Sequence, residues 1–188
     1  MSAPPELPGI VSRAFDVSRR AGYVSFCRNE TGRLLAALAA TRAGTLAEFG
    51  TGCGVGTAWL RSGVRGETQI LTAERDARLA KAAAEIFTDD AQVEVVAADW
   101  STLRDKGPFS LLFLDAHESG GFSADGVVDL VEAGGIVVLD DFNPCESWPP
   151  VTAGRVDVVR EQWLTDERFT AAEVMVAADA AVLIATKR

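Results

Sequence analysis

The chain has 188 residues, of which 48% are apolar and 24% are charged, a composition typical of a globular protein with one hydrophobic core. Its formal net charge of −9 argues against nucleic acid or an anionic membrane as a partner, because phosphate groups are bound by basic surfaces. The three cysteines show no C-x-x-C spacing, which argues against a disulfide framework or a zinc site. We therefore expect a cytoplasmic protein with reduced thiols.

The chain begins with a segment that differs in character from the rest. Residues 1–9 lack the basic and apolar stretches of a signal peptide, so we expect a flexible tail. Residues 10–28 show a weak helical pattern, and we expect them to pack on the main domain or to cover a ligand. Residues 33–41 place leucines on one face of a second helix. We assign residues 1–28 to an N-terminal tail and helical segment, and residues 29–188 to the main domain.

A glycine-rich segment, residues 45–57, separates an apolar run from the next helix. Its sequence, TLAEFGTGCGVGT, has a glycine at every second position from Gly50 to Gly56, preceded by one acid, Glu48. Glycine tolerates positive φ and the close approach of a ligand, and a helix N-terminus offers free N–H groups. The spacing fits neither the G-x-G-x-x-G pattern of dinucleotide sites nor a P-loop, which needs a lysine. The segment predicts a nucleotide-type cofactor turn, and the alternative is a turn that binds nothing.

Strands and helices alternate after this turn. We predict strands at about residues 46–49, 68–73, 93–97, 109–114 and 136–139, with helices at about 55–62, 77–87 and 124–132. The strands are apolar throughout, as expected for a parallel sheet with helices on both faces. A proline-rich loop at 143–152 and a helix at 155–164 follow, and the runs 169–177 and 180–188 predict an antiparallel hairpin at one edge. The fold class is α/β, a Rossmann-like, doubly wound and mostly parallel sheet.

Acidic residues follow strands two to five of this prediction. They are Glu74, Asp99, Asp115 and the pair Asp140 and Asp141. In open α/β sheets, ligands bind beyond the carboxyl ends of the strands, where these acids would lie beside the glycine turn. Glu74 can accept two hydrogen bonds from a ribose diol. Asp99 can accept a hydrogen bond from an adenine amine while Trp100 covers the ring, or Asp99 can cap a helix while Trp100 packs in the core.

Three of these acids, Asp115, Asp140 and Asp141, would repel one another unless they were protonated or bound a cation. An oxygen-only set suits Mg²⁺ or another hard divalent ion, which could hold a substrate hydroxyl and lower its pKa. In the alternative, Asp115 contacts the amino end of a cofactor or the substrate, while Asp140 or Asp141 caps the next segment.

These segments resemble class I S-adenosylmethionine-dependent methyltransferases, in particular the catechol- and caffeoyl-CoA-type O-methyltransferases. The resemblance covers about residues 28–142 and includes ETGRLLAAL, LAEFGTGCGVGTAWL, LTAERD, AADW, FLDA and LDD. It implies a seven-stranded sheet of order 3-2-1-4-5-7-6. It implies that Glu48, Gly50 and Gly52 bind the methionine part of the cofactor, Glu74 the ribose and Asp99 the adenine region. We name Thr51, Gly54, Trp100 and Asp115 as further candidate cofactor contacts. The resemblance further implies a metal held by Asp115, Asp140 and Asp141.

Two features depart from that family. The chain has Asp140-Asp141 where the family usually has Asp-Asn, and it reads AHESG after Asp115, where the family often has a lysine base. His117 is the best replacement as general base, because its ordinary pKa of about 6.5 suits proton removal near neutral pH. We therefore name His117 and Asp115 as candidate catalytic residues. A structural or solvent-facing histidine is the alternative.

We predict an enzyme of class EC 2.1.1.- that transfers the methyl group of S-adenosylmethionine to an oxygen of a small hydroxylated molecule with help from a divalent metal. The N-terminal segment and the 143–152 loop, with Trp148, are expected to contact the acceptor. The alternatives are a metal-independent methyltransferase acting on nitrogen or another acceptor, and a non-catalytic cofactor-binding domain. The expected partner is a small molecule, with neither nucleic acid nor a membrane, and a homodimer is left open.

Overall fold

The computed structural model describes residues 6–24, 26–115 and 122–188. Its main sheet consists of β1 (Leu46–Phe49), β2 (Ile70–Ala73), β3 (Val93–Val96), β4 (Phe109–Leu114), β5 (Val131–Phe142), β8 (Phe169–Ala177) and β9 (Ala180–Lys187). The helices are α1 (Gly9–Ala21), α2 (Asn29–Ala39), α3 (Val55–Gly63), α4 (Ala77–Ile86), α5 (Ala124–Val127) and α6 (Val158–Thr165), with short 3₁₀ helices η1 (Trp100–Lys106) and η2 (Val128–Leu130). A two-stranded sheet pairs β6 (Val151–Thr152) with β7 (Arg155–Val156).

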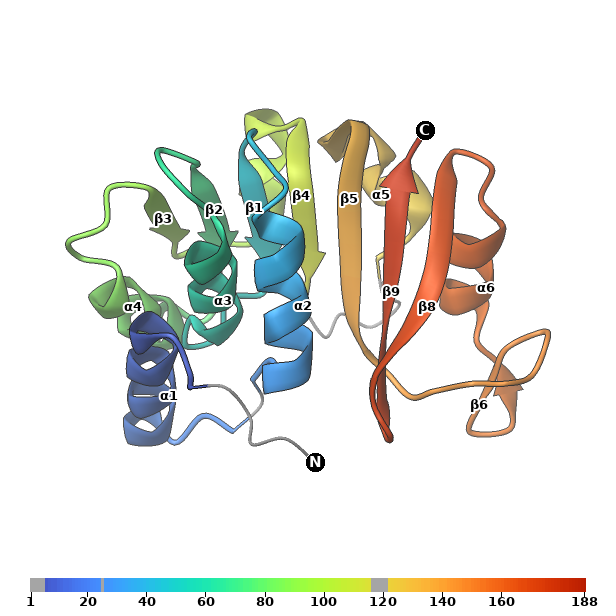
Figure 1. Cartoon of the computed structure of the whole chain (residues 1–188), viewed down its shortest axis with the longest axis horizontal. Helices are drawn as coiled ribbons and strands as arrows, with labels where there is room; N and C mark the ends of the chain where they lie inside the picture. Colours follow the sequence, from blue (N-terminus) through green and yellow to red (C-terminus); the bar gives the residue numbers. More distant parts are fainter. Residues whose placement is uncertain (1–5, 25, 116–121) are drawn as a thin grey trace.

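The main sheet has the order β3-β2-β1-β4-β5-β9-β8 (Figure 1). The first five strands in this order are parallel, and β9 runs antiparallel to both β5 and β8. This confirms the predicted order and the predicted C-terminal hairpin, because β8 and β9 are the sixth and seventh strands of the main sheet along the chain. The carboxyl ends of the parallel strands therefore lie along one edge of the sheet.

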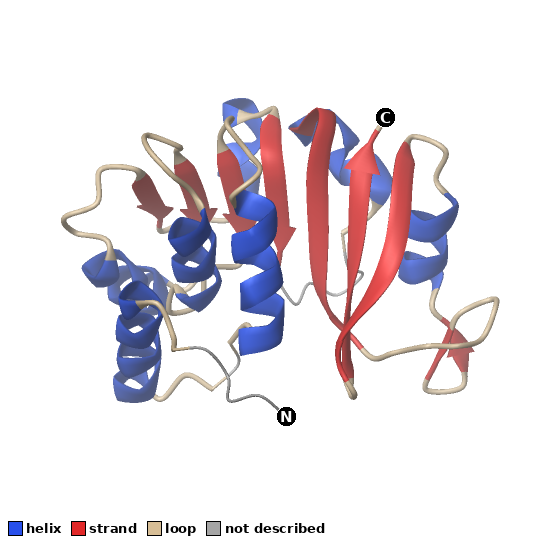
Figure 2. Ribbon diagram, viewed as in Figure 1, coloured by secondary structure: helices blue, strands red, loops and turns tan. Residues whose placement is uncertain are grey.

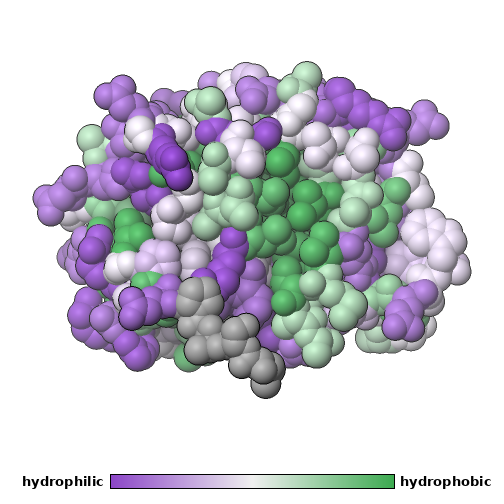
Figure 3. Space-filling view, in the orientation of Figure 1, coloured by the Kyte–Doolittle hydropathy of each residue, from purple (hydrophilic) through white to green (hydrophobic). Residues whose placement is uncertain are grey.

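Helices cover both faces of the sheet (Figure 2). Helices α1 to α4 contribute to one hydrophobic core, and η1, α5, η2 and α6 contribute to a second core on the opposite face. All residues of β1, β2 and β4 are buried, which explains their continuous apolar sequences. Figure 3 shows an apolar surface over β5 and β9, beside α2. In the part of the chain described here, no helix is long and apolar enough to span a membrane.

The N-terminal helix is shorter than predicted. It ends at Ala21 instead of continuing to residue 28, because Gly22 adopts a left-handed conformation with φ 67° and caps the helix. Helix α1 packs against α3 and α4. The chain after Gly22 then runs past the carboxyl edge of the sheet toward α2 (Figure 1), so aromatic residues predicted to be helical instead lie beside the site.

The predicted helix at 124–132 is also too long, and the strand after it is longer than predicted. Helix α5 ends at Val127, and β5 already begins at Val131, before the two glycines that were expected to precede it. The strand accommodates them through a register shift against β4. A Cβ atom at Gly135 would lie 2.6 Å from Val131 Cγ1 and 3.0 Å from the carbonyl oxygen of Phe109, so this close approach of backbones needs glycine.

The predicted helix at 155–164 begins later, at Val158. Residues Arg155–Val156 instead pair with Val151–Thr152 in the small hairpin. Asp157 then caps α6 by accepting a hydrogen bond from the backbone N–H of Arg160 at 3.1 Å.

Candidate functional site

Two cavities lie at the carboxyl edge of the sheet. The turn cavity has a volume of about 190 Å³ and is lined by residues that include Gly50, Gly52, Glu74, Asp99, Trp100 and Asp115. The aspartate cavity also has a volume of about 190 Å³, and it is lined by residues that include Asp115, Asp140, Asp141, Cys27, Phe142 and Asn143. The fold thus brings the strand-end acids to the same edge as the glycine turn, as the topology predicts.

The glycine turn connects β1 to α3 through three residues with left-handed backbone. Gly50, Gly52 and Gly54 have φ values of 98°, 52° and 84°. A side chain at these positions would be strained, which explains the alternating glycines. Gly54 does not line the turn cavity but packs against α4, since a Cβ atom there would lie 3.1 Å from Ile86 Cδ1.

Glu74 joins the end of β2 to this turn. Its Oε2 accepts a hydrogen bond from the N–H of Gly52 at 2.9 Å, and its Oε1 accepts one from the N–H of Asp76 at 2.8 Å. A carboxylate has about four acceptor positions, so Glu74 retains capacity for the hydroxyl groups of a ligand in the turn cavity. Its assignment to a ribose diol stays a prediction.

Asp99 and Trp100 line the same cavity and also have structural roles. Asp99 Oδ1 accepts a hydrogen bond from the N–H of Ser101 at 3.0 Å, and the side chain of Ser101, followed by this backbone bond, lowers the pKa of the carboxyl group. Trp100 stacks on Phe49 with ring centroids 4.9 Å apart. The two interpretations of the sequence are therefore compatible, because each residue supports the fold and still borders the cavity.

Glu48 lies beneath the glycine turn and does not line the turn cavity. Its side chain is completely buried, and its Oε2 accepts hydrogen bonds from the hydroxyl groups of Thr57 and Thr72. Burial raises the pKa of Glu48 to about 8. The side chain of Thr51, in the turn, shares a hydrogen bond with that of Thr72, with 2.5 Å between the two hydroxyl oxygens. Sequence reasoning missed the threonine partners, which link the acid to both ends of the turn.

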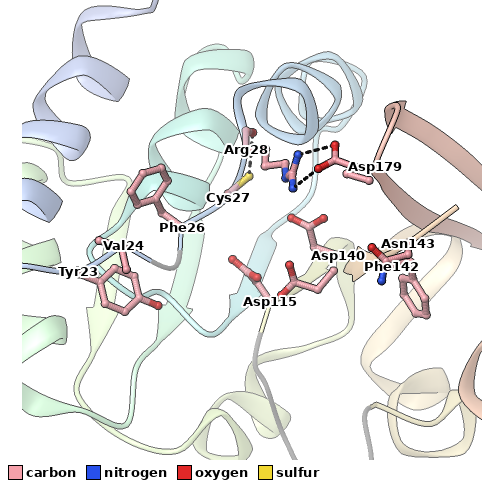
Figure 4. Close-up of a pocket in the computed structure, with 12 residues that line it drawn as sticks. Tyr23, Val24, Phe26, Cys27, Arg28, Asp115, Asp140, Phe142, Asn143 and Asp179 are labelled. Carbon is pink, nitrogen blue, oxygen red and sulfur yellow. Dashed lines mark hydrogen bonds and ion pairs between the residues drawn. The ribbon is translucent and has the colours of Figure 1, made fainter. Parts of the chain in front are cut away.

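Carboxyl groups from β5 and from the residue that follows β4 line the aspartate cavity. Figure 4 shows Asp115 and Asp140 directed into the same space. Burial, and then the charge of Asp140, raise the pKa of Asp115 well above its ordinary value. Burial raises the pKa of Asp140 to about 6, although the hydrogen bonds it accepts, including one from Thr31 Oγ1 at 3.3 Å, oppose this. The cavity thus contains acids that repel one another.

Several solved structures share this architecture. An O-methyltransferase TomG from Streptomyces achromogenes, in complex with S-adenosylmethionine, is 21% identical, with a TM-score of 0.75 over 97% of this chain and 92% of that one. An O-methyltransferase from Bacillus cereus in complex with S-adenosylhomocysteine is 18% identical, with a TM-score of 0.74 over 97% and 92% of the two chains. The Podospora anserina methyltransferase PaMTH1, bound to S-adenosylhomocysteine, is 18% identical, with a TM-score of 0.75 over 97% and 89%.

This chain has the methyltransferase fold. At these identities the likeness establishes the fold, and it extends over nearly the whole chain. No family model matches the sequence, and no curated protein matches it.

Within this methyltransferase fold, the aspartates suit a divalent cation by chemistry but do not form a ready-made group. Among residues 6–24, 26–115 and 122–188, no three histidine, cysteine or acidic side chains are arranged to hold a metal ion. The donors in the aspartate cavity are nevertheless carboxylate oxygens, which hard divalent ions prefer. A bound cation would also remove the repulsion between Asp115 and Asp140. The metal therefore stays a prediction.

The methyltransferase fold also brings together residues that the sequence did not single out. Tyr23 lines both cavities. Arg28 and Asp179 also line the aspartate cavity and form a bidentate ion pair, with N–O distances of 2.9 and 3.0 Å (Figure 4). This pair connects the residue just before α2 to the β8–β9 turn. These two residues are 151 positions apart, so no local pattern could have revealed their pairing.

Two further predictions concern His117 and Trp148. His117, the candidate base, falls outside the described residues. Trp148 is 63% exposed and does not line either cavity. Its predicted contact with the acceptor is therefore not part of the described site.

Proposed function

We propose that this protein is an S-adenosylmethionine-dependent methyltransferase that methylates an oxygen of a small molecule. One observation carries the proposal: the turn cavity and the aspartate cavity share Tyr23 and Asp115 as lining residues. A donor held at the glycine turn would therefore face an acceptor held beside the aspartates. The solved O-methyltransferases with the same fold, bound to S-adenosylmethionine or S-adenosylhomocysteine, support this choice of donor.

The donor would be held by the residues that line the turn cavity. S-adenosylmethionine supplies an electrophilic methyl group on a positively charged sulfur. The carboxylate of Glu74 would accept hydrogen bonds from the ribose, and Asp99 and Trp100 would border the adenine. The positive φ of Gly50, together with its missing Cβ atom, lets the backbone approach this ligand closely.

In the transfer, the acceptor oxygen forms a bond to the methyl carbon as the carbon–sulfur bond breaks, and the electron pair of that bond stays on sulfur. The acceptor proton must leave, and His117 is our candidate base for it, with Asp115 as a second catalytic candidate. The remaining task of the protein is to align the two reactants, which accounts for much of the rate in such displacements.

We further propose that Asp115, Asp140 and Asp141 hold a divalent cation. Such an ion lowers the pKa of a hydroxyl group bound to it. The chemistry of the three carboxylates and the mutual repulsion of Asp115 and Asp140 support this part of the proposal.

The test begins with calorimetric titration of S-adenosylhomocysteine, with and without Mg²⁺. We expect micromolar binding to the wild type, and binding weakened about tenfold or more in Glu74→Ala, because a charged hydrogen-bond acceptor is removed. Glu74→Gln keeps the size of the side chain and separates lost charge from lost packing. Glu67→Ala is the matched control, since Glu67 is exposed in the loop before β2, away from both cavities. Absence of binding to the wild type would refute the proposed donor.

A second candidate is metal-independent transfer to a nitrogen. Asp115, Asp140, Asp141 and Asp179 line the aspartate cavity, and Arg28, the one cationic side chain among its described lining residues, is paired with Asp179. This excess of negative charge would also attract a protonated amine, although the amine must lose its proton before it reacts. Transfer of labelled methyl groups to panels of phenols and amines, with and without a chelator, distinguishes the two candidates.

A further inference from the structure

Tyr23 lies directly against the glycine turn. Its backbone N–H donates a hydrogen bond to the carbonyl oxygen of Ser18 at 3.0 Å, which fixes the residue just after the end of α1. A Cβ atom at Gly52 would lie 2.8 Å from Tyr23 Cε1 and 2.9 Å from its Oη. The ring of Tyr23 therefore occupies the space that any other residue at position 52 would fill.

Tyr23 also stands where the two cavities meet. The turn cavity and the aspartate cavity have two described lining residues in common, Tyr23 and Asp115. The same two residues line a third, very small cavity, of about 10 Å³, beside Thr51 and Gly52. Tyr23 comes from the N-terminal segment and Asp115 from the end of β4, so these two elements border the junction.

Methyl transfer determines which group of the donor reaches this junction. The displacement needs the sulfur, the methyl carbon and the acceptor atom in line. With the donor in the turn cavity and the acceptor in the aspartate cavity, the sulfur must lie near the junction. Tyr23 and Asp115 are then its neighbours.

A sulfonium is a cation with no N–H or O–H group, so hydrogen bonds cannot hold its charge. An aromatic face and a carboxylate can, because both present negative potential. We propose that the ring of Tyr23 contacts the sulfonium of bound S-adenosylmethionine and makes the site select the cationic donor over its neutral product. This inference rests on the proposed function, because it requires a donor at the glycine turn. It gives the N-terminal segment a role in releasing S-adenosylhomocysteine, whose sulfur is uncharged.

The experiment compares the dissociation constants of S-adenosylmethionine and S-adenosylhomocysteine. Tyr23 is replaced by phenylalanine and by phenylalanine rings with one and three fluorine atoms, which weaken the negative potential of the ring at nearly constant shape. We expect the preference for S-adenosylmethionine to fall stepwise along this series. In Tyr23→Leu it should fall by about 3- to 30-fold, the range typical of cation–π contacts. Phe15→Leu is the control, because Phe15 is an aromatic residue of the same N-terminal segment that lines none of these three cavities, and it should leave the preference unchanged.

The outcomes separate this inference from the proposed function. If the wild type binds both ligands and the preference stays constant along the fluorinated series, or if both affinities fall together, the role of Tyr23 is refuted and the methyltransferase remains. If the wild type binds neither ligand, the proposed function fails and the inference fails with it. The fluorinated series keeps the test valid even if Tyr23→Leu does not fold.

Discussion

Thr72 on β2 donates a hydrogen bond of 2.8 Å to Glu48 on the neighbouring strand β1, and the two residues are register partners in the parallel sheet. Thr57, in the first turn of α3, donates to the same carboxylate oxygen. A Cβ atom at Gly56 would lie 2.1 Å from the other oxygen, so glycine is required there to make room for the acid. One buried side chain thus joins β2, the glycine turn and the start of α3.

The first prediction concerns the pH dependence of stability that Glu48 causes. Its pKa is about 8 in the folded protein against an ordinary value of 4.5, so the folded state favours the protonated acid. This contribution to the free energy of unfolding is complete below pH 4.5 and is lost as the pH rises through about 8. By linkage the loss amounts to up to about 4 kcal/mol. Urea unfolding at pH 5 to 9 should show wild type losing stability relative to Glu48→Gln, which cannot titrate.

Glu48→Ala is the comparison that tests the hydrogen bonds. It leaves Thr57 and Thr72 without their acceptor, and we expect it to be less stable than Glu48→Gln by about 1–3 kcal/mol. An equal stability–pH profile for wild type and Glu48→Gln would contradict the prediction.

The second prediction concerns Arg160, a buried residue that anchors the chain after β5. Its Nη2 donates a hydrogen bond to the carbonyl oxygen of Asn143 at 2.7 Å, and its Nη1 lies 3.1 Å from Glu173 Oε2. Its Cζ lies over the Phe142 ring, 5.1 Å from the ring centroid. Arg160→Met should lower the free energy of unfolding by about 3 kcal/mol, because it leaves the carboxylate of Glu173 without its buried partner.

The control for Arg160 is the double substitution Arg160→Met with Glu173→Gln. Arg160 Nε also lies 3.4 Å from Asp157 Oδ2, so the double variant removes one of two carboxylates that lose their partner. It should therefore recover part of the lost stability, as measured by chemical denaturation. Because Phe142 and Asn143 line the aspartate cavity, the single variant should also raise the KM of the acceptor. A loss of stability that the double variant does not reduce would show that packing, and not the ion pair, is responsible.

The sequence predicted those parts of the molecule that depend on local patterns. The glycine turn was predictable because glycines at every second position after an apolar run indicate a backbone with repeated positive φ, and the acids at strand ends followed from parallel topology. The side of the sheet that Glu48 faces could not be predicted, because β1 is buried on both faces and has no alternating pattern. The length of α1 was misjudged because the helical pattern continues past Gly22, where the backbone turns.

The contacts that close the candidate site could not be predicted for a different reason. Tyr23 meets Gly52, and Arg28 meets Asp179, only after the sheet has formed and its edges have been set. Such pairs join segments that are distant in sequence, and one sequence contains no signal for them.

The third prediction concerns the ion pair of Arg28 and Asp179. Both side chains are exposed, so the pair should contribute little to stability, and Arg28→Ala should leave the melting temperature nearly unchanged. The pair lines the aspartate cavity, however, so its removal should change the KM of the acceptor by several-fold without altering the affinity for S-adenosylhomocysteine. A double-mutant cycle with Asp179→Ala measures the coupling. Equal KM values in all four proteins would exclude the pair from acceptor binding.

The fourth prediction tests the metal through the two aspartates that repel each other. If Asp115 and Asp140 hold a divalent cation, Mg²⁺ should raise the thermal stability of the wild type, because an ion that binds only the folded state stabilises it by mass action. Asp115→Asn and Asp140→Asn should abolish this Mg²⁺-dependent shift while raising stability in its absence, since each removes a carboxyl group whose ionised form is destabilised by burial. Asp129→Asn, in η2 and away from both cavities, should keep the wild-type response. A Mg²⁺ shift that persists in both aspartate variants would place the ion elsewhere. No shift in the wild type, together with methyl transfer unaffected by a chelator, would favour the metal-independent candidate, in which the same negative charge attracts the acceptor.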